Sequence, residues 1–137
     1  MARWNDGVSA QPRPGYVLVI DDDAIMRELI GDWLEGAGYE VRKAADCRAV
    51  SLEREGVPSL IVSDMWMPGP CGEEAIRWMR QNHPDVKLIA VSGHFGSGQG
   101  CSAQAAVGAG AARAFAKPVK RAELLGAVAE LIGPAQR

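Results

Sequence analysis

Short apolar runs alternate with helical patterns along most of the chain. Three runs are continuously apolar, or nearly so, and partly β-branched, and they lie at 16–20, 59–63 and 86–92. Such runs are typical of strands buried on both faces of a parallel sheet. Segment 39–44 alternates apolar and polar residues, as an edge strand does, and 112–116 is a further short strand. The pattern therefore predicts five strands.

Helical patterns separate these strands. Asp23 is expected to cap a first helix that ends at Gly36 or Gly38. Its apolar stripe is wide and consists of Ile25, Leu29, Ile30, Trp33, Leu34 and Ala37. Further helices are predicted at 46–55, 72–82, 102–110 and 120–132. The helix at 102–110 should be weak, because each glycine in a helix interior costs about 1 kcal/mol relative to alanine.

Strand and helix thus alternate five times, which predicts right-handed crossovers and a doubly wound parallel sheet with helices on both faces. In the flavodoxin-like strand order, 2-1-3-4-5, the first, third, fourth and fifth strands lie side by side. A ligand site in such a fold lies beyond the carboxyl ends of the strands. The residues that follow each strand are therefore the candidates for function.

Composition narrows the class of protein. The chain has 137 residues, of which 47% are apolar, and a net charge of −2. We expect a loose N-terminal arm at 1–14, one domain at 15–133 and a tail at 134–137. No basic run suggests direct nucleic-acid binding, and no apolar stretch has the length of about 18 residues that a membrane span needs. The N-terminus has no apolar signal core, so a cytoplasmic protein is expected.

Polar residues stand at the ends of four predicted strands. Asp21 and Asp22 follow the first strand, Asp64 the third, Ser92 ends the fourth, and Lys117 follows the fifth. Several carboxylates in one pocket are costly unless a cation neutralises them. Oxygen ligands without histidine or cysteine favour a hard ion such as Mg²⁺. The three cysteines, Cys47, Cys71 and Cys101, have no metal-ligand spacing.

A site with Mg²⁺, a carboxylate, a hydroxyl and an ammonium suits a phosphoryl group. Mg²⁺ and Lys117 would offset charge on the phosphoryl oxygens, and the Ser92 hydroxyl would donate a hydrogen bond to one of them. A carboxylate can act as the nucleophile and form an aspartyl phosphate. Asp64 is the best candidate because it stands alone at the centre of the sheet, whereas the adjacent Asp21 and Asp22 suit metal binding.

The fragments VIDDD, IVSDMWMP, VSGH and AFAKP occur in this order, each at a strand end. In this the chain resembles the receiver domain of bacterial two-component response regulators, of the stand-alone chemotaxis-regulator-like type, over about residues 16–133. The resemblance implies the (βα)₅ fold and transfer of a phosphoryl group from the phosphohistidine of a sensor kinase to Asp64. It also implies particular site residues: a Mg²⁺ site of Asp21, Asp22, Asp64 and the Trp66 carbonyl, a switch hydroxyl at Ser92, a phosphate-binding Lys117, and a switch aromatic at Phe115.

Two stretches depart from the usual family pattern. Trp66, two residues after the expected acceptor, is bulkier than the usual occupant, and its indole could cover the pocket mouth and slow hydrolysis. Segment 96–110 is rich in glycine and alanine. Family members build a firmer fourth helix there, often as part of the partner surface, so a standard output face cannot be assumed.

The leading hypothesis is a single-domain response regulator that receives its phosphoryl group from a sensor histidine kinase or a histidine phosphotransfer protein. It would catalyse only its own phosphorylation and dephosphorylation, and its downstream target is unknown. A receiver fragment of a larger regulator or hybrid kinase is the nearest alternative. A Mg²⁺-dependent phosphohydrolase is disfavoured, because Trp66 occupies the place of its second aspartate. A flavin-phosphate binder would need a Ser/Thr/Gly loop where this chain has carboxylates.

Overall fold

The structure is a computed structural model, and it describes residues 15–45, 58–64, 72–93 and 103–134. The strands are β1 (Val17–Ile20), β2 (Val41–Ala44), β3 (Leu60–Asp64), β4 (Lys87–Ser92) and β5 (Arg113–Ala116). The helices are α1 (Ala24–Gly36), α3 (Gly72–Asn82), α4 (Ala103–Ala109) and α5 (Arg121–Ile132). The helix predicted at 46–55, the three cysteines and Trp66 lie outside the described residues.

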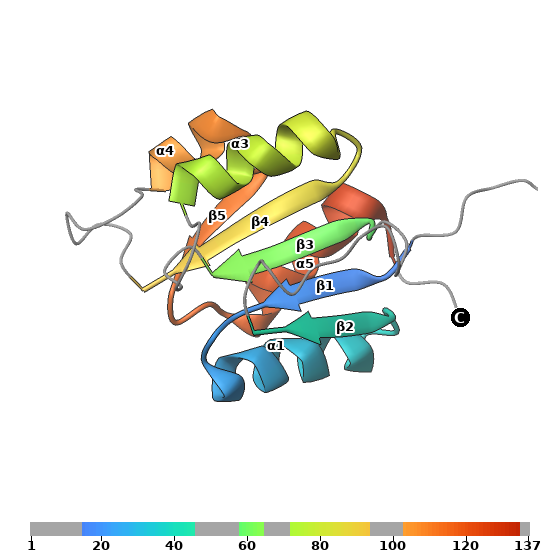
Figure 1. Ribbon diagram of the computed structural model, residues 1–137. Coiled ribbons are helices and arrows are strands. Elements are labelled where there is room, and N and C mark those ends of the chain that lie inside the picture. Colours follow the sequence, from blue (N-terminus) through green and yellow to red (C-terminus); the bar gives the residue numbers. More distant parts are fainter. Residues whose placement is uncertain (1–14, 46–57, 65–71, 94–102, 135–137) are drawn as a thin grey trace, which may run out of the picture.

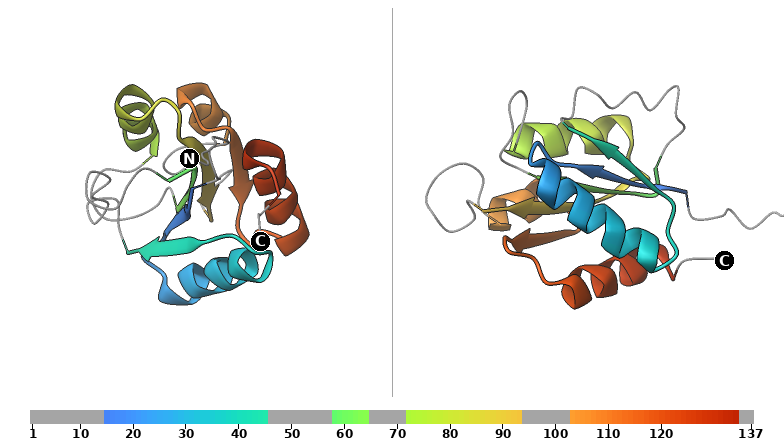
Figure 2. Two further views of the ribbon diagram at one scale, coloured as in Figure 1. Left: turned by 90° about the vertical axis from the view of Figure 1, so that its right-hand side faces the viewer. Right: turned by 90° about the horizontal axis from the view of Figure 1, so that it is seen from below.

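The strands form one five-stranded sheet in the order β2-β1-β3-β4-β5, and each neighbouring pair is parallel. Helices cover both faces of this sheet: α1 and α5 lie on one side, and α3 and α4 on the other (Figures 1 and 2). The predicted doubly wound fold and its strand order are therefore confirmed. β2 is an edge strand with half-exposed side chains, as its alternating sequence indicated.

Each face of the sheet packs against its own helices because side chains alternate along a strand. On β4, Ile89 and Val91 belong to the core that includes Leu34 of α1 and Leu124 of α5. Leu88 and Ala90 belong to the core under α3 and α4. The parity of a residue in its strand therefore decides which helix pair it meets.

Helix α1 begins as predicted. The Asp23 carboxylate accepts hydrogen bonds from the backbone N–H groups of Ile25, at 2.9 Å, and Met26, at 3.4 Å. This satisfies two of the free donors of the first turn. After the helix ends at Gly36, Gly38 has a φ of 100°, which lies in the left-handed region that glycine adopts at little cost. The cap marks where α1 begins after β1, and the turn lies where the chain passes from α1 to β2.

The predicted apolar stripe of α1 is only partly correct. Ile30 and Leu34 are buried, and Trp33 packs half-buried against the same core. Ile25 and Leu29, however, are 79% and 39% exposed. At 3.6 residues per turn, they lie about 140° and about 100° around the helix from Ile30, so they point away from the sheet. Two large apolar side chains therefore remain on the outer surface of α1.

The described residues contain no helix long and apolar enough to cross a membrane.

Candidate functional site

The predicted site residues meet at the carboxyl edge of the sheet. In the register of the strands, Ile20 pairs with Ser63, Asp64 with Val91, and Ser92 with Ala116. The residues next along the chain, Asp21 and Lys117, therefore emerge at the same edge as Asp64 and Ser92. The backbone N–H of Lys117 also donates to the carbonyl oxygen of Ser92 at 3.0 Å.

Three carboxylates form a cluster at this edge. Ligand oxygens of Asp21, Asp22 and Asp64 all lie within 4.8 Å of one another. Asp21 and Asp64 are only 2% and 5% exposed, whereas Asp22 is exposed. Burying two carboxylates this close together is unfavourable unless positive charge compensates them.

Lys117 supplies positive charge to the cluster. Its Nζ lies 3.0 Å from Oδ2 of Asp21 and 3.6 Å from Oδ2 of Asp64. Partial burial of the ammonium opposes its charge, but the hydrogen bond that Lys117 donates to Asp21 and the charges of Asp64 and Asp21 outweigh this burial, so the pKa of Lys117 lies above its ordinary value. The lysine is therefore an ammonium throughout the physiological pH range.

The donor set fits a divalent cation. Three carboxylates and one ammonium leave an excess of negative charge, and all the available ligand atoms are oxygens. Mg²⁺ prefers such ligands and usually retains several waters, which the exposed position of Asp22 allows. Asp21, Asp22 and Asp64 are the described residues that could hold the ion. The expected fourth ligand, the Trp66 carbonyl, falls outside the described residues.

Hydrogen bonds fix Asp21 on three sides. Its Oδ1 accepts from the backbone N–H of Asp23 at 2.9 Å, and its Oδ2 accepts from Lys117. Its main-chain carbonyl accepts from Nη1 of Arg27 at 2.7 Å. Sequence reasoning did not identify Arg27, since an arginine in the first turns of a helix carries no signal of what its guanidinium will reach.

Ser92 and Phe115 lie on opposite sides of the sheet. Ser92 is buried at the end of β4, and it shares the strand parity of Ala90, which faces α3 and α4. Phe115 packs against the core of α1 and α5, whereas its neighbour Ala114 faces α3 and α4. The expectation that Phe115 is an aromatic that rotates toward Ser92 does not fit this packing. Phe115 is instead a half-buried core residue.

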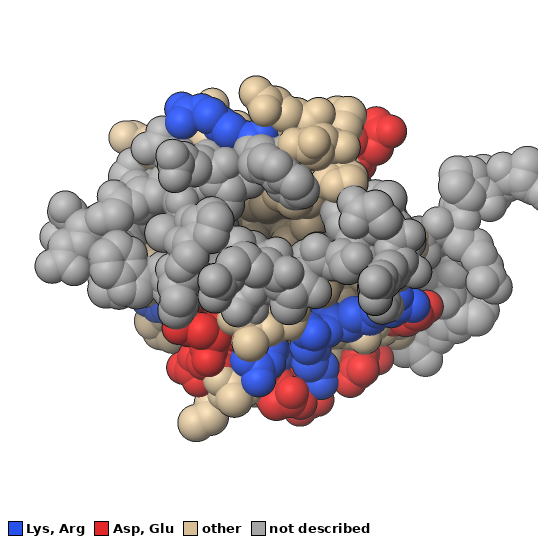
Figure 3. All heavy atoms as spheres, viewed as in Figure 1, with Lys and Arg blue, Asp and Glu red and all other residues tan. Residues whose placement is uncertain are grey.

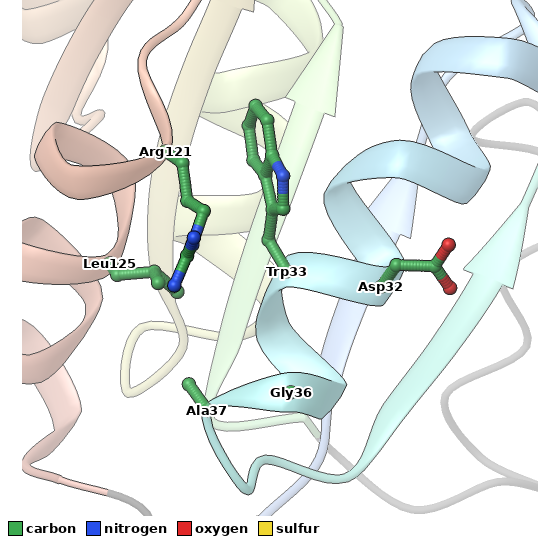
Figure 4. Close-up of a pocket in the computed structure, with 6 residues that line it drawn as sticks. All are labelled: Asp32, Trp33, Gly36, Ala37, Arg121 and Leu125. Atoms are coloured by element: carbon green, nitrogen blue, oxygen red, sulfur yellow. The ribbon is translucent and has the colours of Figure 1, made fainter.

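A groove of about 180 Å³ lies between α1 and α5 (Figure 4). Its lining includes the Trp33 indole, which lies between the two helices, and the side chains of Arg121 and Leu125 on the α5 side. None of the acidic cluster lines it. The groove is therefore separate from the site at the carboxyl edge.

Charged side chains of both signs alternate over α1 and β2 on the face shown in Figure 3. Two ion pairs account for part of this mixture: Lys43 with Glu28 at 2.9 Å, and Arg42 with Glu40 at 3.4 Å. Charges of mixed sign do not build the single-sign field that attracts nucleic acid. That the chain binds no nucleic acid directly stays a prediction.

The protein is thus a doubly wound α/β domain, and the acidic cluster at the carboxyl edge of its sheet is suited to bind a divalent cation. Residues 17–129 match the family described as the response regulator receiver domain. The chain therefore belongs to the receiver domains of two-component response regulators. Members of this family interact with kinases and with downstream targets.

Individual relatives differ in how much of their length the chain covers. It is 33% identical over 114 residues to the chemotaxis protein CheY of Thermotoga maritima, an alignment that covers 82% of this chain and 92% of CheY. It is 34% identical over 79 residues to the C4-dicarboxylate transport transcriptional regulatory protein DctD of Pseudomonas aeruginosa, but spans only 17% of that protein. The match to the response regulator GacA of Pseudomonas syringae covers 37% of that protein.

Solved receiver structures are similar in fold. The beryllofluoride-activated NtrC4 receiver domain dimer matches with a TM-score of 0.75 and 29% identity, over 85% of this chain and 95% of that chain. A response regulator from Burkholderia pseudomallei, solved with a phosphorylated aspartic acid, a calcium ion and citrate, matches with a TM-score of 0.68 and 26% identity. That match covers 85% of this chain and 66% of the Burkholderia chain.

Proposed function

We propose that the chain accepts a phosphoryl group on Asp64 from a sensor histidine kinase or a histidine phosphotransfer protein, with Mg²⁺ bound at the acidic cluster. The observation that carries this proposal is the position of the Asp64 carboxylate. It is almost fully buried, it shares a cluster with Asp21 and Asp22, and it lies 3.6 Å from the ammonium of Lys117. A nucleophile, a cation site and a fixed positive charge thus converge on one point.

The proposed transfer has a simple balance of bonds. A carboxylate oxygen of Asp64 forms a bond to phosphorus, the phosphorus–nitrogen bond of the phosphohistidine breaks, and the imidazole nitrogen keeps the electron pair and takes up a proton. When bound, Mg²⁺ would offset charge on the carboxylates and the phosphoryl oxygens. Lys117, already charged beside Asp64, would hydrogen-bond a phosphoryl oxygen without the need to gain a proton.

Ser92 is proposed as the hydroxyl that responds to phosphorylation. It is the last residue of β4, the strand next to that of Asp64, and its backbone carbonyl accepts a hydrogen bond from the N–H of Lys117. A hydrogen bond from its hydroxyl to the phosphoryl group would therefore act on the β4 end and on the start of the Lys117 segment together. Phe115 has no part in this proposal, because it faces the other side of the sheet.

The solved Burkholderia regulator supports an aspartyl phosphate as the product and a divalent cation as its companion. In that protein a phosphorylated aspartic acid and a calcium ion occur together, within a fold similar to that of this chain. The acidic cluster described above has the oxygen ligands that such a pair needs.

The exposed apolar residues of α1 are proposed to receive the phosphodonor. Ile25 and Leu29 stand four residues apart on the outer surface of the helix that begins beside Asp22 and Asp23. A donor protein that buries these side chains would bring its phosphohistidine close to the carboxyl edge of the sheet. This placement gives a physical reason for leaving two large apolar groups in water.

We favour a single-domain response regulator that switches partner binding, because the CheY alignment extends over 92% of that protein. A receiver attached to an output domain is the alternative, and the short match to the much longer DctD supports it. In either case the chain would catalyse only its own phosphorylation and dephosphorylation.

Phosphate uptake tests the proposal and separates it from a phosphohydrolase. The wild-type chain should incorporate at most one acid-labile phosphate from a small phosphodonor, should need Mg²⁺ to do so, and should release phosphate slowly. The Asp64→Asn variant should incorporate none while keeping its fold. Continuous release of phosphate from small phosphate esters, at many turnovers per chain, would instead identify a hydrolase.

A further inference from the structure

Arg27 contacts the β1–α1 segment through both its side chain and its backbone. Its Nη1 donates to the main-chain carbonyl of Asp21 at 2.7 Å, and its backbone N–H donates to the carbonyl of Asp23 at 2.9 Å. The side chain is half-buried. One residue of α1 therefore holds both residues that flank Asp22.

The two flanking carboxylates are also fixed. The Asp21 carboxylate accepts from the Asp23 N–H and from Lys117, and the Asp23 carboxylate caps α1. Asp22, between them, is exposed, and among the described residues its carboxylate has no hydrogen-bond or ion-pair partner. Within the described part of the chain it is held in the cluster by its backbone alone, and its oxygens are available to a cation.

We propose that Arg27 is a positioning residue for the cation site, which acts by fixing the Asp21 carbonyl and thereby the direction in which Asp22 presents its carboxylate. This inference rests on the proposed function only in that both use the same cation site. A ligand held in place before the ion arrives loses less conformational entropy on binding. Groups that orient metal ligands commonly change metal affinity about 10- to 100-fold when they are replaced.

Positioning and charge make opposite predictions for this residue. A guanidinium near three carboxylates repels a divalent cation, so a purely electrostatic Arg27 would weaken binding, and its removal would tighten it. A positioning Arg27 strengthens binding, and its removal would weaken it. The sign of the change in affinity therefore distinguishes the two roles.

The test measures Mg²⁺ affinity by isothermal titration calorimetry at constant ionic strength, without any phosphodonor. Arg27→Gln should bind Mg²⁺ about tenfold more weakly than the wild type. Arg27→Lys, which keeps a donor and the charge but lacks the planar fork, should fall between the two. Arg113→Gln is the matched control. Arg113 is the first residue of β5, at the opposite end of that strand from Lys117, and it forms an ion pair with Glu130 of α5. The Mg²⁺ affinity of Arg113→Gln should equal that of the wild type.

Melting temperatures of the metal-free variants identify a merely structural role. Weaker Mg²⁺ binding by Arg27→Gln, with a metal-free melting temperature near that of the wild type, supports positioning. Equal or tighter binding overturns it, as does a lower melting temperature with unchanged affinity. If Arg27→Gln does not fold, Arg27→Lys decides by the same comparison. If the wild type is phosphorylated on Asp64 but replacing Arg27 leaves the Mg²⁺ affinity unchanged, only this inference is contradicted. If the wild type itself does not bind Mg²⁺, the proposed Mg²⁺ requirement for phosphorylation is contradicted as well.

Discussion

The Nζ of Lys117 lies 3.0 Å from Oδ2 of Asp21, although 96 positions separate the two residues in the chain. Asp21 follows β1, the first strand along the chain, and Lys117 follows β5, the last, so this pair joins the carboxyl ends of these two strands. The Asp21 carboxylate is almost fully buried and depends on this partner for charge compensation.

Replacement of Lys117 by methionine should therefore destabilise the metal-free protein, by about 2 kcal/mol, because Asp21 and Asp64 lose their ammonium. Mg²⁺ should then raise the melting temperature more in Lys117→Met than in the wild type, since the ion replaces the missing charge. Lys43→Met is the control, because the Lys43–Glu28 pair is exposed and contributes little. An equal Mg²⁺-dependent rise in Lys117→Met and the wild type would show that Lys117 does not compensate the cluster.

Ile25→Gln and Leu29→Gln should slow phosphorylation by the protein donor that serves the wild type, by about tenfold for the pair together, because the apolar contact is lost. Phosphorylation by a small phosphodonor should stay at the wild-type rate, since neither residue belongs to the acidic cluster. Val107→Gln provides a matched control: Val107 is 50% exposed, but it stands on α4 on the other side of the sheet. Loss of rate with the small donor would mean that the substitutions disturb the site itself.

Phe115→Leu should lower the free energy of unfolding by about 1 kcal/mol, because the ring packs against the α1–α5 core. The changes in amide chemical shift that beryllofluoride causes in Phe115→Leu should nevertheless match those of the wild type, since the ring and Ser92 lie on different faces of the sheet. Ser92→Ala should reduce these changes. Two-dimensional amide NMR of the three proteins measures them directly. A response lost in Phe115→Leu but retained in Ser92→Ala would reverse the roles assigned here.

The fold could be predicted from the sequence because apolar and polar residues repeat with the periods of strands and helices. Buried strands, helical repeats and polar strand ends predicted the sheet, and also that Asp21, Asp64, Ser92 and Lys117 would share one edge. It was less informative where direction in space matters. A four-residue repeat that includes Ile25 and Leu29 does not reveal which side of a helix meets the sheet, and the parity of Phe115 depends on where β5 begins. Arg27 could not be found, because its contact requires a particular side-chain path back to Asp21.

Tyr39 connects the start of the β2 segment to the end of α5. Its hydroxyl donates to the Gly133 carbonyl at 2.8 Å, and burial raises the pKa of Tyr39 above its ordinary value. Tyr39→Phe should cost about 1 kcal/mol at neutral pH. Because the folded-state pKa is the higher one, the Tyr39 contribution is fully present below about pH 10 and is lost as pH rises through the folded-state value. The difference in stability between wild type and variant should thus shrink above pH 10. Urea denaturation at several pH values measures this, and a difference that grows with pH would contradict the assignment.

Chemical trapping of the phosphorylated residue tests the central claim most directly. Borohydride reduces an aspartyl phosphate to homoserine, so the wild-type chain, treated with a small phosphodonor and Mg²⁺ and then reduced, should carry homoserine at position 64 by peptide mass spectrometry. Asp85→Asn, which alters an exposed aspartate after α3, should give the same product at the same position. Asp64→Asn should give none. Homoserine at Asp21 or Asp22 in the wild type, or undiminished trapping in Asp64→Asn, would contradict the account.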